Sequence, residues 1–439
     1  MHWGHAVSSD LVTWEELPIS LYPDELGTIF SGSAVIDEFN NTGLQTGDTD
    51  LLVAIFTHAG ETQQQSIAFS NDNGHTMEKY DGNPVLPNPG ILDFRDPKVL
   101  RYNDEKWIQV LAAGDRIIFY TSDDLLTWDK LSEFGANPLE GSHDGVWECP
   151  DLLPLEIGET TIWVLLVSIN PGAPNFGSGT QYFLGDFDGT TFRSYGWNEF
   201  QWLDWGWDNY AGVTFANEPN KRKILIGWMN NWMYANEVPT SPWRGQMTLP
   251  RELSLQLLDG KVWLASNPIS ELTELRTGQI RERYNATLNA GSFLFLQDGI
   301  SFRNSLLEVD INLSFKGNPW FAICFANYLE EEVCFGYKHE EREFYMDRSK
   351  SGNVNFHPDF YQYVRATRPG GKQSMNIKIY LDDSSIEAFA DNGITAMTGL
   401  FFPTEPLFLV YMFNVQRAFA SDVFIESAVI RGLNSIHGC

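Results

Sequence analysis

The sequence predicts an all-β protein in which a β-propeller is followed by a β-sandwich. Three observations support this fold class. A short turn motif recurs through the first half of the chain, and apolar strand-like runs recur between its copies every fifty-odd to sixty-odd residues. Beyond about residue 265 this recurrence stops, and apolar residues alternate with polar ones, as in two packed sheets.

The turn motif combines Ser or Asp with Thr and an aromatic residue or Met. Each copy is predicted to form a tight turn closed by Asp or Gly, with the aromatic residue or Met entering the next strand. The copies lie at residues 8–14, 70–77, 122–128 and 186–192.

Between these turns lie apolar runs with the composition of short strands. A repeat of this length, with several strands and no helical periodicity, is typical of propeller blades. An ordinary β-sandwich with similar turns is the alternative interpretation. The runs lie at residues 51–56, 107–111, 162–167 and 224–228.

The same patterns predict the domain limits. We place the propeller at residues 1–265, a connector at 266–284 and the sandwich at 285–439. A short helix is one option for the first ten residues of the connector. The alternating strands that predict the sandwich include 306–311, 375–381 and 385–390.

Composition narrows the possible partners. The 29 Lys and Arg against 58 Asp and Glu give a formal net charge of −29, which argues against nucleic acid and against an anionic membrane surface. No run is apolar and long enough to span a bilayer. Aromatic residues make up 14% of the chain and fit either a β-sheet core or platforms that stack on sugars.

The four cysteines are too few for a disulfide scaffold and do not have metal-binding spacing, so no metal or cofactor is predicted. Cys324 and Cys334 flank a predicted hairpin turn, where a disulfide and two buried thiols both remain open. Glycosylation sequons favour secretion, although no signal peptide opens the sequence. The sequons lie at Asn40, Asn285 and Asn312.

Two acidic motifs carry the chemistry. Residues 94–99 place Asp96 between Arg95 and a proline, and residues 147–151 place Glu148 beside Trp147. Cleavage of a glycoside uses two carboxyl groups in different environments, one ionised beside the developing positive charge and one that donates a proton to the leaving oxygen. The two motifs therefore predict a glycosidase site.

These motifs, in this order, resemble those of glycoside hydrolase family 32, the invertases, inulinases and levanases. The resemblance runs through nearly the whole chain and is similar to the yeast and fungal type. Further segments that match the family are residues 2–6, 30–34, 168–174, 230–234, 242–247 and 384–389.

The resemblance implies a five-bladed propeller with a C-terminal sandwich and retaining cleavage of terminal β-fructofuranosides such as sucrose, inulin or levan. It implies that Glu148 is the general acid/base and that Asp96 stabilises the transition state. Arg95 would keep Asp96 ionised and contact the sugar. Trp147 and Cys149 would raise the pKa of Glu148.

The resemblance also implies the residues and partners around the substrate. Phe30 and Ser31 would line the fructose subsite, Trp232 would form a wall of it, and Asp208 is a further pocket candidate. The expected partner is a small or oligomeric fructoside. The family further implies secretion, and the β-sandwich offers a surface for homo-oligomers.

The family's nucleophile, the Asp of an Asn-Asp-Pro motif, has no counterpart in the 439 residues. In the family it precedes the stretch that matches residues 2–6, so we expect a first blade that is truncated at its N-terminus and impaired catalysis. A non-catalytic sucrose- or fructan-binding protein and a decayed fragment are the alternatives. A sialidase-like propeller is disfavoured because arginines are few.

Overall fold

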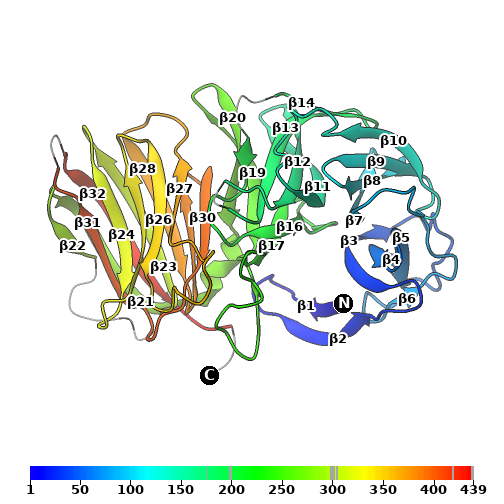
Figure 1. Ribbon diagram of the computed structural model, residues 1–439, viewed down its shortest axis with the longest axis horizontal. Helices are drawn as coiled ribbons and strands as arrows, with labels where there is room; N and C mark the ends of the chain where they lie inside the picture. The colour runs from blue at the N-terminus through cyan, green and yellow to red at the C-terminus, as the bar shows by residue number, and fades with distance from the viewer. Residues whose placement is uncertain (175, 197–199, 297–301, 303–304, 418–419, 437–439) are drawn as a thin grey trace. The chain divides into compact units, whose positions relative to one another are not determined.

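The computed structural model describes residues 1–174, 176–196, 200–296, 302, 305–417 and 420–436 (Figure 1). It is nearly all β, as predicted, and its described helix is the short 3-10 segment η1 (Ser270–Leu275). The chain forms two compact units. The first unit comprises residues 1–173, 180–202 and 211–226, and the second unit comprises 174–179, 203–210 and 227–439.

Successive antiparallel sheets make up the first unit, as expected for propeller blades. Among the described residues, the first sheet has two strands, the next two have four each and the fourth has five. In chain order the strands are β1 (Trp3–Val7), β2 (Glu15–Leu21), β3 (Thr28–Asp37), β4 (Leu51–Ala59), β5 (Gln63–Ser70), β6 (Glu78–Lys79), β7 (Phe94–Tyr102), β8 (Lys106–Ala113), β9 (Ile117–Ser122), β10 (Asp129–Phe134), β11 (Val146–Ile157), β12 (Thr160–Asn170), β13 (Gly179–Phe187), β14 (Phe192–Ser194) and β15 (Gln201–Trp202).

The recurring turn motif forms the same local structure between β1 and β2 and between β9 and β10. Asp10 Oδ1 accepts hydrogen bonds from the backbone N–H groups of Val12 and Thr13 at 2.8 and 2.7 Å. Asp124 Oδ1 accepts two in the same way, from Leu126 and Thr127, both at 2.8 Å. The carboxylate replaces the missing backbone partners of the turn. The prediction of tight Asp-closed turns is confirmed at these positions.

Apolar side chains of neighbouring sheets form the core of the first unit. Val53 and Ile55 of β4 pack in one cluster with Val99 of β7, Trp107 of β8 and Leu125 of the turn between β9 and β10, all of them buried. The apolar runs recognised in the sequence are thus the buried central strands.

A further sheet has the strand order β16-β17-β19-β20, and β18 pairs with β17. These strands are β16 (Tyr210–Thr214), β17 (Ile224–Met229), β18 (Gln246–Met247), β19 (Arg251–Leu258) and β20 (Lys261–Pro268). Regular structure fills most of the predicted connector at 266–284, because η1 follows β20 and β21 (Arg276–Leu288) begins directly after η1. The two compact units also do not divide at 265, since residues 174–179 and 203–210 belong to the second unit.

Two six-stranded sheets form the sandwich within the described residues, with orders β21-β32-β23-β28-β29-β30 and β22-β31-β24-β25-β26-β27. Their inner faces share one apolar core that includes Val309, Phe335 and Ile379. The strands are β22 (Phe293–Phe295), β23 (Leu307–Phe315), β24 (Trp320–Ala326), β25 (Glu332–Lys338), β26 (Glu343–Lys350), β27 (Tyr363–Thr367), β28 (Ser374–Leu381), β29 (Ser385–Ala390), β30 (Thr395–Leu400), β31 (Leu409–Asn414) and β32 (Val423–Leu433).

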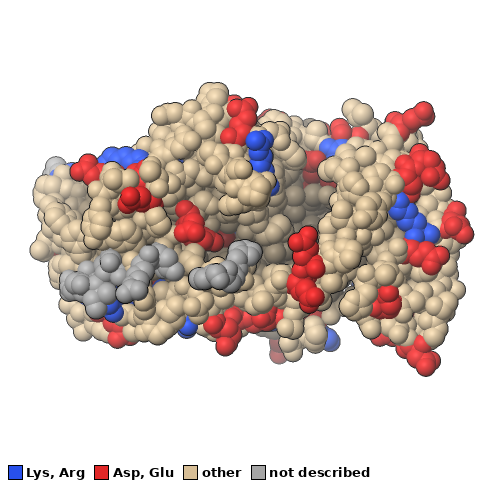
Figure 2. Space-filling view, turned by 90° about the horizontal axis from the view of Figure 1, so that it is seen from below, with Lys and Arg blue, Asp and Glu red and all other residues tan. Residues whose placement is uncertain are grey.

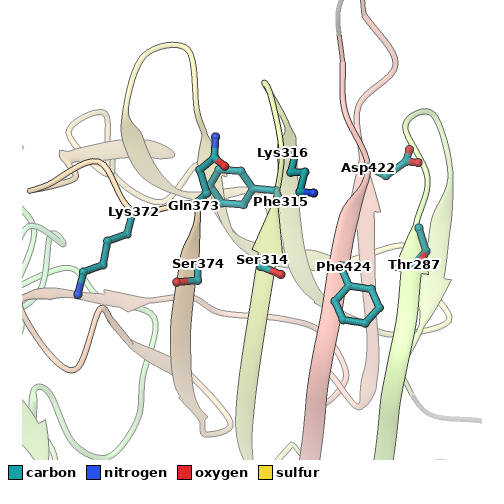
Figure 3. Close-up of a pocket in the computed structure, with 9 residues that line it drawn as sticks. All are labelled: Thr287, Ser314, Phe315, Lys316, Lys372, Gln373, Ser374, Asp422 and Phe424. Atoms are coloured by element: carbon teal, nitrogen blue, oxygen red, sulfur yellow. The ribbon is translucent and has the colours of Figure 1, made fainter.

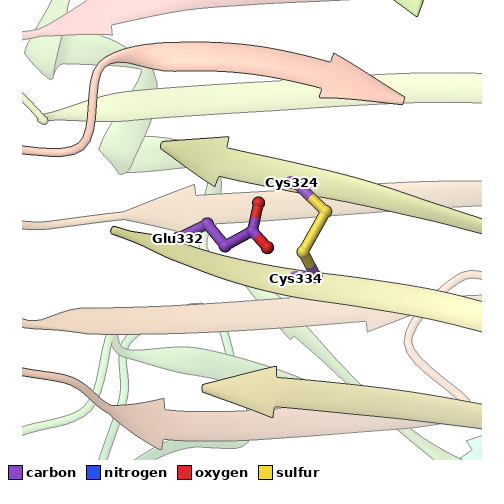
Figure 4. A group of neighbouring side chains, drawn as sticks. All are labelled: Cys324, Glu332 and Cys334. Carbon is purple, nitrogen blue, oxygen red and sulfur yellow. A yellow bond between two sulfur atoms is a disulfide. The ribbon is translucent and has the colours of Figure 1, made fainter. Parts of the chain in front are cut away.

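Cys324 and Cys334 lie opposite each other on β24 and β25 and form a disulfide, which decides between the two options left by the sequence (Figure 4). With Glu332 they are the one group of three potential metal ligands found among the described residues. The sulfur atoms are bonded to each other and are therefore not free thiolate ligands.

The surface agrees with the net charge of −29. Figure 2 shows a face on which Asp and Glu are spread widely and Lys and Arg are sparse. None of the described helices has the length and apolar character needed to cross a membrane.

Candidate active site

The motifs singled out in the sequence lie where strands of the first unit lose their regular register. The pairing of β3 with β4 shifts between Ile29 and Gly32, that of β7 with β8 between Arg95 and Lys98, and that of β11 with β12 between Glu148 and Asp151. Such bulges bend a strand and redirect its side chains.

Backbone strain marks two of these bulges. Asp96 has a φ of 66° and Cys149 a φ of 44°, in the left-handed region that residues other than glycine rarely occupy. Such conformations persist where surrounding contacts enforce them, and they cluster at functional sites. The bulges in β7 and β11 thus bring the two acidic motifs together.

Asp96 is buried, with 5% of its surface exposed. Its Oδ2 accepts hydrogen bonds from the backbone N–H of Cys149 at 3.0 Å and from the Cys149 thiol at 3.6 Å. Burial raises the pKa of Asp96 to about 6, and the negative charge of Glu148 adds to this, whereas the Cys149 N–H and the charge of Arg95 oppose it. With a pKa of about 6, Asp96 changes its protonation state slightly below neutral pH.

The hydrogen bonds of Arg95 go to residues other than Asp96. Its guanidinium donates to Glu148 Oε1 from Nη2 at 3.1 Å and from Nε at 3.2 Å. It also pairs with Asp93 and donates to Gln63 Oε1 at 3.2 Å. The charge of Arg95 favours the ionised form of Asp96, as predicted, but burial outweighs it and the pKa of Asp96 is raised.

Glu148 is partly exposed, with 20% of its side chain accessible, and forms an ion pair with Arg95. Trp147 does not cover it. The indole is fully buried, donates from Nε1 to the carbonyl oxygen of Ser142 at 2.7 Å and stacks on His143. Successive side chains of a strand point to opposite faces, which explains why Trp147 packs into the core while Glu148 does not.

Two polar residues that the sequence did not reveal support the Asp96 bulge. Thr57 and Gln65 are fully buried on β4 and β5. Thr57 Oγ1 accepts the Asp96 N–H at 3.0 Å and donates to Gln65 Oε1 at 2.7 Å, and Gln65 Nε2 donates to the carbonyl oxygen of Phe94 at 2.9 Å. The only signal in the sequence was a polar residue at the end of an apolar strand run.

The motifs also contain an anchoring pair. Lys98 lies two residues after Asp96, Asp151 lies three after Glu148, and their side chains form a buried ion pair at 3.0 Å. Asp151 Oδ2 also accepts from Thr214 N and Oγ1, both at 2.7 Å. Since breaking a buried pair leaves an uncompensated charge, this pair holds β7 and β11 in place beside the site.

Phe30 and Ser31 lie on β3 at its bulge. Ser31 is exposed, and its hydroxyl interacts with the thiol of Cys149, which places it beside the Asp96 partner. Phe30 is half-buried, and its carbonyl oxygen accepts from Trp3 Nε1 at 2.8 Å. A Cβ at the next residue, Gly32, would lie 2.0 Å from the carbonyl oxygen of Ile55, so the bulge requires glycine there.

The other two pocket candidates belong to the second unit. Trp232 is 49% exposed and lies 4.9 Å from Trp228, ring centre to ring centre. Asp208 is fully buried, and its oxygens accept from the Tyr234 hydroxyl, from Arg348 Nη1 at 3.0 Å and from the backbone N–H of Leu400 at 2.8 Å. The structure thus corrects the pocket prediction for Asp208, whose oxygens hold the interior together.

The three sequon asparagines lie in different settings. Asn40 is half-buried, and its side-chain oxygen accepts from Gln45 N at 3.0 Å. Asn285 is exposed on β21. Asn312 is exposed on β23 and donates to Ser427 Oγ at 3.1 Å.

Comparisons with known proteins place this chain in one family. The family description "Glycosyl hydrolases family 32 N-terminal domain" matches residues 1–268, and "Glycosyl hydrolases family 32 C terminal" matches residues 271–429. The chain is 46% identical over 421 residues to a levanase of Bacillus subtilis, covering 92% of this chain and 60% of the levanase. It is 37% identical over 448 residues to an extracellular exo-inulinase of Aspergillus awamori, covering 92% of this chain and 82% of the inulinase.

Solved structures show the same fold. The crystal structure of exo-inulinase from Aspergillus awamori superposes with a TM-score of 0.88 at 31% identity, over 99% of this chain and 90% of that one. The β-fructofuranosidase of Schwanniomyces occidentalis, complexed with fructosyl-erythritol, gives 0.89 at 29% identity, over 99% and 89%.

Proposed function

Because the chain belongs to glycosyl hydrolase family 32, we propose that it is a β-fructofuranosidase-type glycosidase acting on terminal β-D-fructofuranosides. The observation that carries the proposal is the meeting of Asp96 and Glu148 at two strand bulges, with Arg95 bonded to Glu148. Sucrose, inulin and levan are the proposed substrate class, which the names of the relatives support.

In this proposal Glu148 donates a proton to the leaving oxygen as the bond to the fructosyl anomeric carbon breaks. When the carboxyl group of Glu148 carries this proton it is neutral, so its ion pair with Arg95 is weakened. The ionised form of Asp96 then accepts hydrogen bonds from fructose hydroxyls as positive charge develops on the ring. Because Asp96 has a pKa of about 6 before substrate binds, this step is favoured above pH 6.

Retention of configuration also needs a carboxylate nucleophile, and the 439 residues contain no Asn-Asp-Pro motif. We therefore propose that these residues alone bind fructosides and hydrolyse them slowly. A polypeptide that contains these residues and also supplies the carboxylate nucleophile to the site is expected to have ordinary turnover. A non-catalytic fructan-binding role is the second candidate, which the same missing motif favours.

A rescue experiment with a small anion tests the proposal. Azide can attack the anomeric carbon in place of the nucleophile while Glu148 protonates the leaving glucose oxygen of sucrose, giving fructosyl azide and glucose. Glucose release by the 439-residue chain should be roughly 10³-fold below ordinary enzyme rates without azide and rise with azide. The rise should disappear in Glu148→Gln.

The control is Glu156→Gln, which changes an exposed glutamate on the same strand, β11. It should behave as the unchanged chain. Ordinary turnover without azide would show that a nucleophile already lies within residues 1–439. Equal azide rates in Glu148→Gln and the unchanged chain would refute the role of Glu148. Fructoside binding without any azide-dependent product would favour the binding protein.

We propose secretion as well. The disulfide between Cys324 and Cys334 supports it, since such bonds persist in oxidising compartments. Several relatives are named extracellular. The yeast or fungal subtype and the sandwich-mediated homo-oligomer stay predictions.

A further inference from the structure

The outer face of one sandwich sheet carries a row of small hydroxyl side chains with one exposed aromatic ring. By strand pairing, Ser374 of β28 lies opposite Ser314 of β23, Ser314 opposite Phe424 of β32, and Phe424 opposite Thr287 of β21. Figure 3 shows these four side chains on neighbouring strands. Phe424 is 40% exposed, whereas Val423 and Ile425 on either side of it are buried.

A second row runs parallel to the first, further along the same strands. It pairs Asn376 with Asn312, Asn312 with Ser427 and Ser427 with Tyr284. Asn312 and Tyr284 are exposed, the latter by 54%. We call the two rows the sandwich platform.

The platform is hollowed. An open cavity of 760 Å³ lies over the first row and extends to Lys316, Lys372 and Asp422 (Figure 3). A second cavity of 250 Å³ is lined by Asn312 and Asn376 and shares Lys372 and Ser374 with the first. Four strands at the usual spacing measure about 14 Å across, enough for several sugar rings.

The chemistry of the platform fits a neutral, polyhydroxylated chain. Its hydroxyl and amide groups donate to and accept from sugar hydroxyls without a charge to desolvate. The rings of Phe424 and Tyr284 offer apolar faces to C–H groups. Neither row contains a charged residue, in a chain whose net charge is −29, and the charged side chains that line the cavities belong to other positions, among them Lys316, Lys372 and Asp422.

We propose that the sandwich platform binds a β-fructan chain and holds the polymer that the first-unit site trims. This proposal rests on the proposed function for the identity of the sugar. The two can nevertheless fail separately, because binding at the platform does not require Glu148 or a nucleophile.

Affinity electrophoresis through gels that contain levan or inulin tests the platform. The Glu148→Gln chain is produced without glycosylation, so that Asn285 and Asn312 carry no sugar, and excess fructose saturates the first-unit site. Polymer should still retard the chain. Phe424→Ala should weaken binding about tenfold, and Ser374→Glu, at an exposed position, should weaken it similarly. Tyr328→Ala, 74% exposed outside the platform, should leave binding unchanged.

Three results would overturn the proposal. The first is no retardation by either polymer. The second is retardation of the Phe424→Ala and Ser374→Glu chains equal to that of the Glu148→Gln parent chain. The third is a change of oligomeric state in Phe424→Ala without polymer binding, which would make the face an interface between copies. If polymer binding depends on Phe424 but azide yields no product from sucrose, the platform stands and the proposed hydrolase function fails.

Discussion

Both units bury carboxylates, but the partners of these carboxylates differ. In the first unit, Asp96 accepts only from the N–H and thiol of Cys149, and its Oδ1 accepts no hydrogen bond from the described residues. In the second unit, Asp208 is bonded to Arg348, Tyr234 and Leu400 N. A buried acid with both oxygens occupied serves the fold, whereas one with an open oxygen keeps bonding capacity for a ligand.

Glu387 of the second unit resembles Asp208, because it is buried and both of its carboxylate oxygens accept hydrogen bonds. Glu387 is buried, and its oxygens accept from Arg251 Nε at 3.1 Å and from Leu249 N at 2.8 Å. Burial raises the pKa of Glu387 and the charge of Arg251 opposes this. Arg251 also pairs with Asp204 at 2.8 Å. The second unit thus neutralises its buried acids with arginines, which the first unit does not do for Asp96.

The largest expected effect comes from removing one of these arginines. Arg348→Met should lower the free energy of unfolding by about 3–5 kcal/mol, because it leaves the charge of Asp208 buried without its counter-ion. Chemical denaturation measures the change. The matched control is Arg365→Met on the neighbouring strand β27, where the side chain is 68% exposed and should matter by less than about 0.5 kcal/mol. If Arg348→Met and Arg365→Met lower the free energy of unfolding equally, the buried arginine does not neutralise Asp208 and the contrast between the units is wrong.

Asp96→Asn should raise the free energy of unfolding at neutral pH, the opposite of the effect of Arg348→Met. The folded pKa of about 6 lies above the ordinary aspartate value of 3.8, so the stability that Asp96 contributes is present below pH 3.8 and is lost as pH rises through 6. At pH 7 the variant should be more stable by on the order of 1–3 kcal/mol, while fructoside binding weakens. Denaturation between pH 4 and 7 should show a smaller loss of stability in the variant.

Asp208→Asn is compared with Asp96→Asn in the same denaturation experiment. Asp208→Asn should lower the stability of the protein at pH 7, because Arg348 then lacks its counter-charge. If both variants stabilise, burial alone decides the behaviour of these acids and the pairing argument is wrong.

The smallest expected effect concerns the support beneath Asp96. Thr57→Val keeps the shape of the side chain but removes the hydroxyl that the Asp96 N–H and Gln65 use, which should cost about 1–2 kcal/mol and weaken fructoside binding. Thermal denaturation and calorimetry measure the two effects. Thr161→Val, whose exposed hydroxyl donates to Glu156, should change neither. Unchanged binding in Thr57→Val would show that the bulge does not depend on this support.

Local patterns predicted the elements well, because turns and strands are encoded within a few residues. The Asp-closed turns and the central strands formed as expected. The connector was predicted too long, since the polar residues 276–284 are edge-strand residues of β21, and an exposed edge strand lacks the apolar alternation that identifies a buried strand.

The sequence by itself determined the fold class, the family and the two acidic motifs, because these depend on short runs of residues. Only the tertiary structure decided which partner each charged group has. Arg95 meets Glu148 across 53 residues and Asp208 meets Arg348 across 140. Long-range pairing depends on strand register and bulges, so neighbours in the chain do not reveal it. That is why Asp208 was mistaken for a pocket residue and the support by Thr57 and Gln65 was not foreseen.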